Sequence, residues 1–244
     1  MDRLIYTAMS GAKATMTRQD ALANNLANAT TPGFRADLSA FRAVPVRGDG
    51  LTTRVHSLEA TAGFDATQGP VTQTGRTLDI TVKGAGWIAV QGLDGNEAYT
   101  RAGSLAVSAD GTLQTNSGLA VMGDGGPIVI PQGAEVAIGS DGTVSAKVGT
   151  TPPTTMGMIK LVNPGPGELR KGVDGLMRMR GGDPAPADPL VKIVSGAVEG
   201  SNVNPVASMV GMIGAARQFD MQMKMMQTVE GNEQRAAKLL ANNG

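Results

Sequence analysis

The side chains used most often in catalysis are scarce in this chain. His56 is the single histidine, and there is no cysteine. A Ser-His-Asp triad would have to use His56, which lies in Arg54-Val55-His56-Ser57, a predicted connector without strand-to-helix context. We therefore expect His56 to be packed or solvated. The missing cysteines exclude disulfides, thiolate metal ligands and a cysteine nucleophile, so a zinc site would depend on carboxylates.

Glycine-containing turns raise the question of phosphate or calcium binding. Gly84-Ala85-Gly86 follows a predicted strand as a phosphate loop would, but Trp87-Ile88 begins another strand where a helix N-terminus is required. The Asp-Gly turns lack the alternating acidic ligands and the closing glutamate of an EF-hand loop. We therefore predict no cofactor, no metal ion and no catalytic site.

A methionine cluster near the C-terminus allows two interpretations. Its members are Met221, Met223, Met225 and Met226. They could bind a soft metal such as Cu(I), or form an adaptable apolar surface for several partners. Helical spacing of the wider apolar set favours packing. Glu230 and Glu233 could act as an acid-base pair, but a solvated face, or ion pairs with Arg217 or Lys224 of another chain, is the favoured interpretation.

Composition limits the class of protein. Lysine plus arginine equals aspartate plus glutamate at 21 each, so the net charge is zero and no electrostatic footprint for nucleic acid exists. The 244 residues suffice for one large or two small domains. No stretch approaches the roughly 18 apolar residues of a membrane span. The N-terminus lacks the layout of a secretory signal, so export would need a machine that leaves it uncleaved.

Both ends of the chain are predicted to be amphipathic helices, over residues 1–28 and 205–241. In the first, apolar residues recur at spacings of three and four, and Pro32-Gly33 enforces a stop. The second has Asn204 as its N-cap and Pro205 at its first position. A helix with one apolar stripe must bury that stripe, and the simplest partner for the first helix is the last.

The middle of the chain is predicted to be β-rich. From Thr77 the apolar residues alternate with period two, and later short apolar runs flank Asp94-Gly95, Asp110-Gly111 and Asp141-Gly142, which are typical hairpin turns. The fold class is therefore α+β, with a coiled-coil-like pair of terminal helices and an inserted, mainly antiparallel β domain. The predicted domains are the helical module, the connector and the β-rich domain, over residues 1–33 plus 201–244, 34–75 and 76–200.

Several motifs, in the right order along the chain, resemble the axial proteins of the bacterial flagellum, the rod and hook family. The most specific is Asn24-Asn25-Leu26-Ala27-Asn28 followed by Thr31-Pro32-Gly33-Phe34. Residues 78–82, 86–90 and 99–103 are similar to the central sheet of that family. Gly200-Ser201-Asn202-Val203-Asn204-Pro205 resembles the lead-in to its C-terminal helix. Within the family, residues 34–38, 42–46 and 217–224 are most similar to the proximal-rod branch.

The resemblance implies a structural function and a location. Such subunits leave the cell through the flagellar type III export apparatus without cleavage and polymerise in the periplasm, forming the rod of the basal body. The implied partners are other proximal- and distal-rod subunits, copies of this chain and the export apparatus. No nucleic acid or small-molecule substrate is expected. A distal-rod or hook-type subunit is the alternative, and a wall hydrolase or a β-rich binding module is less favoured.

The predicted subunit interface lies on the two terminal helices and on the turn after the first. Its members are Leu22, Asn24, Asn25, Leu26, Asn28, Met212, Phe219, Met223 and Met226. We expect the apolar members to be buried against neighbours, and the asparagines to form hydrogen bonds across the interface. Both terminal segments are expected to be largely disordered in the free monomer and to fold on assembly.

Overall fold

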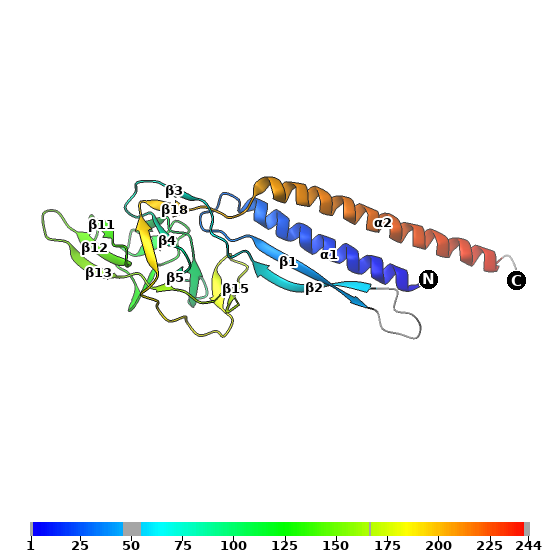
Figure 1. The fold of residues 1–244 in the computed structure, drawn as a ribbon, viewed down its shortest axis with the longest axis horizontal. Helices are drawn as coiled ribbons and strands as arrows, with labels where there is room; N and C mark the ends of the chain where they lie inside the picture. Colours follow the sequence, from blue (N-terminus) through cyan, green and yellow to red (C-terminus); the bar gives the residue numbers. More distant parts are fainter. Residues whose placement is uncertain (1, 46–54, 166, 242–244) are drawn as a thin grey trace. The chain divides into compact units, whose positions relative to one another are not determined.

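A computed structural model describes residues 2–45, 55–165 and 167–241 (Figure 1). The chain divides into two compact units. We call residues 1–27, 37–64 and 204–244 the helical unit, and residues 28–36 and 65–203 the β unit. The observed class is α+β with a β-rich domain, as predicted. The predicted domain boundaries themselves remain predictions.

The helical unit contains two antiparallel helices, α1 (Asp2–Ala27) and α2 (Pro205–Ala241) (Figure 1). Glycines allow them to approach closely. A Cβ atom added to Gly11 would lie 2.8 Å from the side-chain nitrogen of Gln222, and one added to Gly211 would lie 3.1 Å from Leu22. Because these two contacts pair the beginning of one helix with the later part of the other, they also define the antiparallel register.

The helix ends follow from local chemistry. The Asn204 side chain accepts a hydrogen bond from the N–H of Ala207 at 3.0 Å, so the predicted N-cap of α2 is confirmed. After α1, the backbone N–H of Thr31 bonds to the carbonyl of Asn28 at 3.2 Å and closes a turn. Gly33 then adopts a positive φ of 69°, a conformation that a residue with a Cβ rarely takes.

Part of the predicted connector forms a hairpin in the helical unit. Strand β1 (Asp37–Pro45) pairs antiparallel with β2 (Val55–Phe64), with a register irregularity between Ala40 and Phe41. The hairpin contacts α1. No sustained period marked these strands in the sequence because Leu38 is exposed and the bulge interrupts the alternation. Residues 46–54 of the predicted connector lie outside the described residues.

The described strands of the β unit are short and pair antiparallel wherever they are joined. They are β3 (Val71–Gln73), β4 (Ile80–Lys83), β5 (Trp87–Gln91), β6 (Glu97–Thr100), β7 (Leu105–Val107), β8 (Leu113–Thr115), β9 (Met122–Gly123), β10 (Gly126–Pro127), β11 (Glu135–Ile138), β12 (Thr143–Lys147), β13 (Thr154–Met158), β14 (Leu161–Val162), β15 (Leu169–Lys171), β16 (Met177–Met179), β17 (Lys192–Ser195) and β18 (Ala197–Glu199). The largest sheet has the order β14-β5-β6-β16-β15, beside a sheet β11-β12-β13 and two-stranded pairs that include β17-β4 and β18-β3.

The three Asp-Gly hairpin turns are confirmed. They connect β5 to β6, β7 to β8 and β11 to β12, and Gly95, Gly111 and Gly142 all have positive φ. Small aliphatic side chains from most strands fill one continuous core. The alternation predicted from Thr77 correctly places Ile80 and Val82 in the core, but the polar residues Asp79 and Thr81 on the other side of the strand are buried as well. Asp79 is satisfied there by the hydroxyl of Ser104 at 3.1 Å.

Candidate assembly surface

The predicted apolar interface residues do not all lie on one free surface. Leu22, Leu26, Met212, Phe219 and Met226 are half-buried, and Met223 is exposed. Leu22 packs against Gly211 of the same chain. On α2 the half-buried members Met212, Phe219 and Met226 are seven positions apart, as are buried Ser208 and Ala215. This stripe therefore takes part in the helix pair itself, and its role between subunits stays a prediction.

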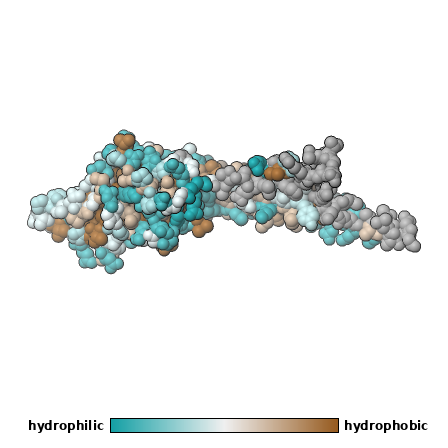
Figure 2. Space-filling model, turned by 90° about the horizontal axis from the view of Figure 1, so that it is seen from below, coloured by the Kyte–Doolittle hydropathy of each residue, from teal (hydrophilic) through white to brown (hydrophobic). Residues whose placement is uncertain are grey.

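A second apolar stripe is exposed on the helices, and of its members the sequence had suggested only Met221 and Met225 as part of an adaptable apolar surface. On α2 it consists of Val206, Met209, Val210, Ile213, Met221 and Met225, and on α1 of Tyr6, Met9 and Met16. These side chains are more than half exposed, with Ile213 at 56% and Met221 at 62%. The signal was present in the sequence, because a helix that is apolar on more than one side is buried on more than one side. The face of the β unit seen in Figure 2 is mostly hydrophilic, with hydrophobic residues in small groups.

The predicted interface asparagines form hydrogen bonds within the chain. Asn25, which is 6% exposed, donates to the carbonyl of Asp37 at 3.0 Å and accepts from the N–H of Asp37 at 2.7 Å. Asn24 donates to the Asp37 carboxylate at 2.6 Å. The side chain of Asn28 accepts from the hydroxyl of Thr31 at 3.1 Å. The Asn-Asn motif thus fastens the start of β1 to the end of α1, a function that needs no neighbouring subunit.

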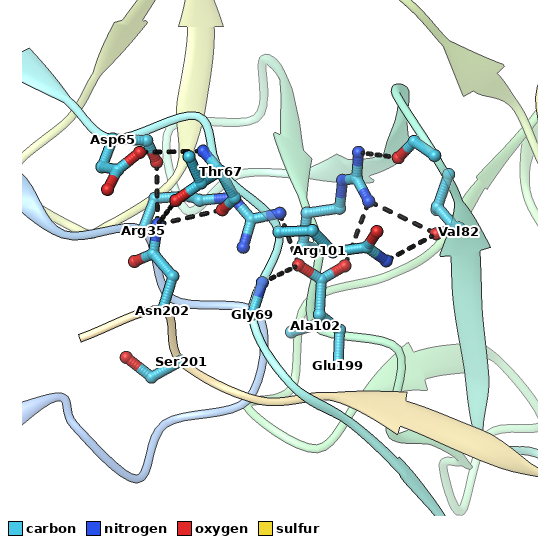
Figure 3. A network of polar contacts seen from close by, with 12 residues as sticks. Arg35, Asp65, Thr67, Gly69, Val82, Arg101, Ala102, Glu199, Ser201 and Asn202 are labelled. Atoms are coloured by element: carbon cyan, nitrogen blue, oxygen red, sulfur yellow. Dashed lines mark hydrogen bonds and ion pairs between the residues drawn. The ribbon is translucent and has the colours of Figure 1, made fainter. Parts of the chain in front are cut away.

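A buried charged cluster lies inside the β unit (Figure 3). Glu199 is 0% exposed, and its Oε1 lies 2.5 Å from Nη2 of Arg35 while its Oε2 accepts from Nη1 of Arg101 at 3.0 Å. Oε1 also accepts from the backbone N–H of Gly69 at 3.0 Å. Both guanidinium groups lie over the ring of Trp87, at 5.7 Å for Arg35 and 5.4 Å for Arg101. One carboxylate therefore neutralises two buried cations only in part, and the aromatic face supplies further stabilisation.

Electrostatics in this cluster depend on Glu199. Burial lowers the pKa of Arg101, an effect that the negative charge of Glu199 offsets in part and the positive charge of Arg35 increases. Arg101 also donates to the carbonyl of Gly84 at 2.7 Å, so the Gly84-Ala85-Gly86 turn presents an acceptor to a cation. This is the opposite of what an anion-binding phosphate loop requires.

The cluster holds the two family-like motifs against each other within the β unit. The N–H of Gly33 donates to the carbonyl of Glu199 at 2.8 Å. The side chain of Asn202 accepts from the N–H of Ala36 at 2.8 Å and donates to the carbonyls of Asp65 and Thr67, each at 3.0 Å (Figure 3). A Cβ added to Gly33 would lie 2.3 Å from the backbone that joins Arg101 to Ala102, so no larger residue fits.

Sequence reasoning did not identify Arg35, Arg101 and Glu199 as partners. Charged side chains are usually exposed, and the residue types alone do not distinguish these three from solvated residues. The one local signal is that Arg35 and Glu199 adjoin the Pro-Gly-Phe and Gly-Ser-Asn motifs. Within the part of the chain that is described, no group of three or more His, Asp or Glu side chains could hold a metal ion. None of the described helices is long and apolar enough to span a membrane.

Family models match three parts of the chain. "Flagella basal body rod protein" matches residues 5–35, "Flagellar hook protein FlgE/F/G D1 domain" residues 81–146, and "Flagellar basal body rod FlgEFG protein C-terminal" residues 194–239. The match over residues 5–35 includes the N-terminal asparagine motif, and the match over residues 194–239 includes the whole lead-in to α2.

Curated relatives extend this similarity to the full length. The flagellar basal-body rod proteins FlgF of Salmonella typhimurium and of Escherichia coli are each 46% identical over 250 aligned positions, covering 99% of this chain and 99% of each relative. The flagellar basal-body rod protein FlgG of Buchnera aphidicola subsp. Acyrthosiphon pisum is 29% identical, covering 96% of this chain and 98% of the relative. The chain therefore belongs to the flagellar basal-body rod protein family.

Proposed function

We propose that the chain is a structural subunit of the proximal part of the flagellar basal-body rod, without catalytic activity, and that it polymerises with other axial proteins and copies of itself. Full-length similarity to two FlgF proteins supports the assignment. The observation that carries the mechanism is the exposed apolar stripe on α1 and α2. Monomeric proteins rarely expose extended apolar surface, and such surface indicates an interaction site.

In the proposed mechanism each predicted domain has its own structural role in the rod. Residues 1–33 and 201–244 act as a coiled-coil-like assembly module, residues 76–200 provide lateral contacts and stiffness, and residues 34–75 connect the two. Contacts between unlike surfaces of successive subunits do not close into a ring, and they generate a helical tube. Each fully buried apolar side chain stabilises such contacts by about 1.5–3 kcal/mol, part of which offsets the entropy lost on association.

Half-buried and exposed residues of the helices have different roles in the proposed assembly. The half-buried members, among them Leu22, Met212 and Phe219, pack the helices of one subunit together. The exposed members, such as Ile213 and Met221, contact neighbouring subunits. The nine predicted interface residues remain part of the proposal, and the asparagines shape the helix end on which the contacts depend.

The proposed route is export through the flagellar type III apparatus without cleavage, followed by assembly in the periplasm. This part of the proposal depends on the family resemblance. Mass spectrometry of the subunit recovered from purified basal bodies would test it, and recovery of an N-terminally cleaved chain would refute it. The position along the rod is tested by deleting the gene and determining where rod growth stops, since a proximal subunit is needed before the distal rod forms.

A pair of substitutions on α2 tests the assembly surface. Met221→Glu removes an exposed apolar side chain and would place a carboxylate in the interface, whereas Gln227→Glu adds the same charge at an exposed polar position on another side of the helix. We expect Met221→Glu to reduce incorporation into basal bodies by at least roughly tenfold, equivalent to about 1.4 kcal/mol, and Gln227→Glu to have a much smaller effect. Equal incorporation of the two variants would refute the surface.

Phe219→Asp tests the half-buried stripe in the same assay. We expect this variant to fail to enter the rod while the β unit remains folded, because the charge would be buried in the helix pair. Normal motility of cells that carry only this variant would contradict the predicted role of the stripe.

A further inference from the structure

Exposed methionine is concentrated on the helices. Among the described methionines, those that are more than half exposed all lie on α1 or α2: Met9, Met16, Met209, Met221 and Met225. By contrast, Met177 in β16 is 1% exposed, and Met158 in β13 is 42% exposed. The thioether does not titrate in water, so access of the oxidant decides which methionine sulfur reacts first.

We propose that these five methionines, here called the helical methionines, are sites of reversible oxidation by hydrogen peroxide in the subunit before it is assembled. A lone pair on Sδ attacks one peroxide oxygen, and the S–O bond forms as the O–O bond breaks. The departing hydroxide takes the proton from the transferred oxygen and leaves as water. Sulfur loses two electrons and becomes a sulfoxide, while the peroxide is reduced.

The expected consequence is a block of assembly, and this step rests on the proposed function. A sulfoxide oxygen is a strong hydrogen-bond acceptor, and burying it in an apolar contact without a donor is unfavourable. Oxidation therefore converts part of the assembly surface into a polar one. After assembly the same sulfur atoms are covered by neighbours, so the proposal also predicts that incorporated subunits resist peroxide.

Methionine at these positions can be oxidised, but it also packs adaptably against several neighbours. Its unbranched, polarisable side chain adapts to surfaces of different shape, as a subunit with several unlike neighbours requires. Valine and isoleucine occupy nearby exposed positions on the same helix, at Val206, Val210 and Ile213, and these cannot be oxidised in this way. Sensitivity to peroxide thus belongs to the methionine positions and not to the whole surface.

The test uses the full-length chain in cells that lack the chromosomal copy. Expression is induced with and without a sublethal dose of hydrogen peroxide, and the basal bodies and the unassembled pool are then isolated. Mass spectrometry measures sulfoxide at each methionine in both fractions. The comparison variant replaces all five helical methionines with leucine, and each variant is compared with its own untreated culture. Buried Met177 and partly exposed Met158 serve as internal references for access.

We expect sulfoxide in the unassembled pool to be at least roughly tenfold higher at the helical methionines than at Met177. Peroxide should reduce incorporation of the unsubstituted chain roughly tenfold and that of the leucine variant far less. Incubation of the unassembled pool with methionine sulfoxide reductase and a thiol should remove the added oxygen.

The proposal would be overturned if the helical methionines were oxidised no faster than Met177, or if peroxide lowered incorporation of both chains equally. It would also be overturned if sulfoxide at these positions were as abundant in basal bodies as in the unassembled pool. Failure of the proposed function gives a different result, because the untreated chain would then be absent from basal bodies.

Discussion

The buried charged cluster gives the sharpest prediction, through the substitution Glu199→Gln. Glutamine keeps the shape of the side chain but removes the carboxylate that, among the residues the structure describes, pairs with both Arg35 and Arg101. Its amide oxygen can still accept hydrogen bonds, but its amide nitrogen would face other donors, either Arg101 or both Arg35 and the N–H of Gly69. Two buried cations would then lack a counter-ion, since all three charged side chains are at most 5% exposed.

Breaking a buried ion pair by removing one partner costs about 3–5 kcal/mol. For a protein of this size, each kcal/mol lowers the midpoint of thermal unfolding by about 2–4 °C, so we expect a decrease of roughly 6–20 °C for the β unit. Trp87 is the single tryptophan and lies against both guanidinium groups, so its fluorescence reports unfolding of the cluster directly.

Two further variants complete this experiment. Glu135→Gln makes the same chemical change at an exposed position of β11 and should alter the free energy of unfolding by less than about 0.5 kcal/mol. Combining Glu199→Gln with Arg35→Met removes one cation together with the anion, so the double variant should lose less than the sum of the two single losses. If Glu199→Gln unfolded within about 1 kcal/mol of Glu135→Gln, the claim that the cluster stabilises the β unit would be refuted.

Three other predictions concern backbone, pH and assembly. Gly33→Ala should cost about 1–3 kcal/mol more than Gly75→Ala in denaturant unfolding, because both have positive φ but only Gly33 faces backbone within 4 Å. Burial raises the pKa of Tyr99 to about 12 against an ordinary value of 10.0. The contribution of Tyr99 to the free energy of unfolding is therefore fully present below pH 10 and is lost as the pH rises to about 12, at up to about 1.4 kcal/mol per pH unit. Tyr99→Phe should flatten this pH dependence. Amide exchange of the isolated chain should show weak protection over residues 210–235 because Ala215 is the one described residue there that is buried, and strong protection would contradict folding on assembly.

Local signals predicted the element types and many of their boundaries. Asn204 and Pro205 specify where α2 begins because capping and a fixed φ act within one turn of the helix. The Asp-Gly pairs specify hairpins because a single glycine at positive φ reverses the chain. The start of α2 and the hairpin turns depend on residues that are adjacent in the sequence, so the sequence alone is sufficient to predict them.

The hairpin of β1 and β2 was harder to predict. Its strands are interrupted by a bulge and expose Leu38, so neither shows a clear alternation. It forms against α1, and its first residue is held by Asn25 through two hydrogen bonds. The asparagines that the sequence suggested for contacts between subunits are thus engaged in a contact that only the folded chain reveals.

The sequence by itself determined the class of the fold, the family and the absence of cysteine and histidine chemistry beyond His56, because composition, spacing and turn residues carry that information directly. Only the tertiary structure decided which apolar stripe of α2 packs on α1 and which stays exposed, and which charged residues are buried together. The physical reason is that burial is a property of segments that meet in space. Arg35 and Glu199 are distant along the chain, and either would be assigned to solvent until the fold brings each to the other.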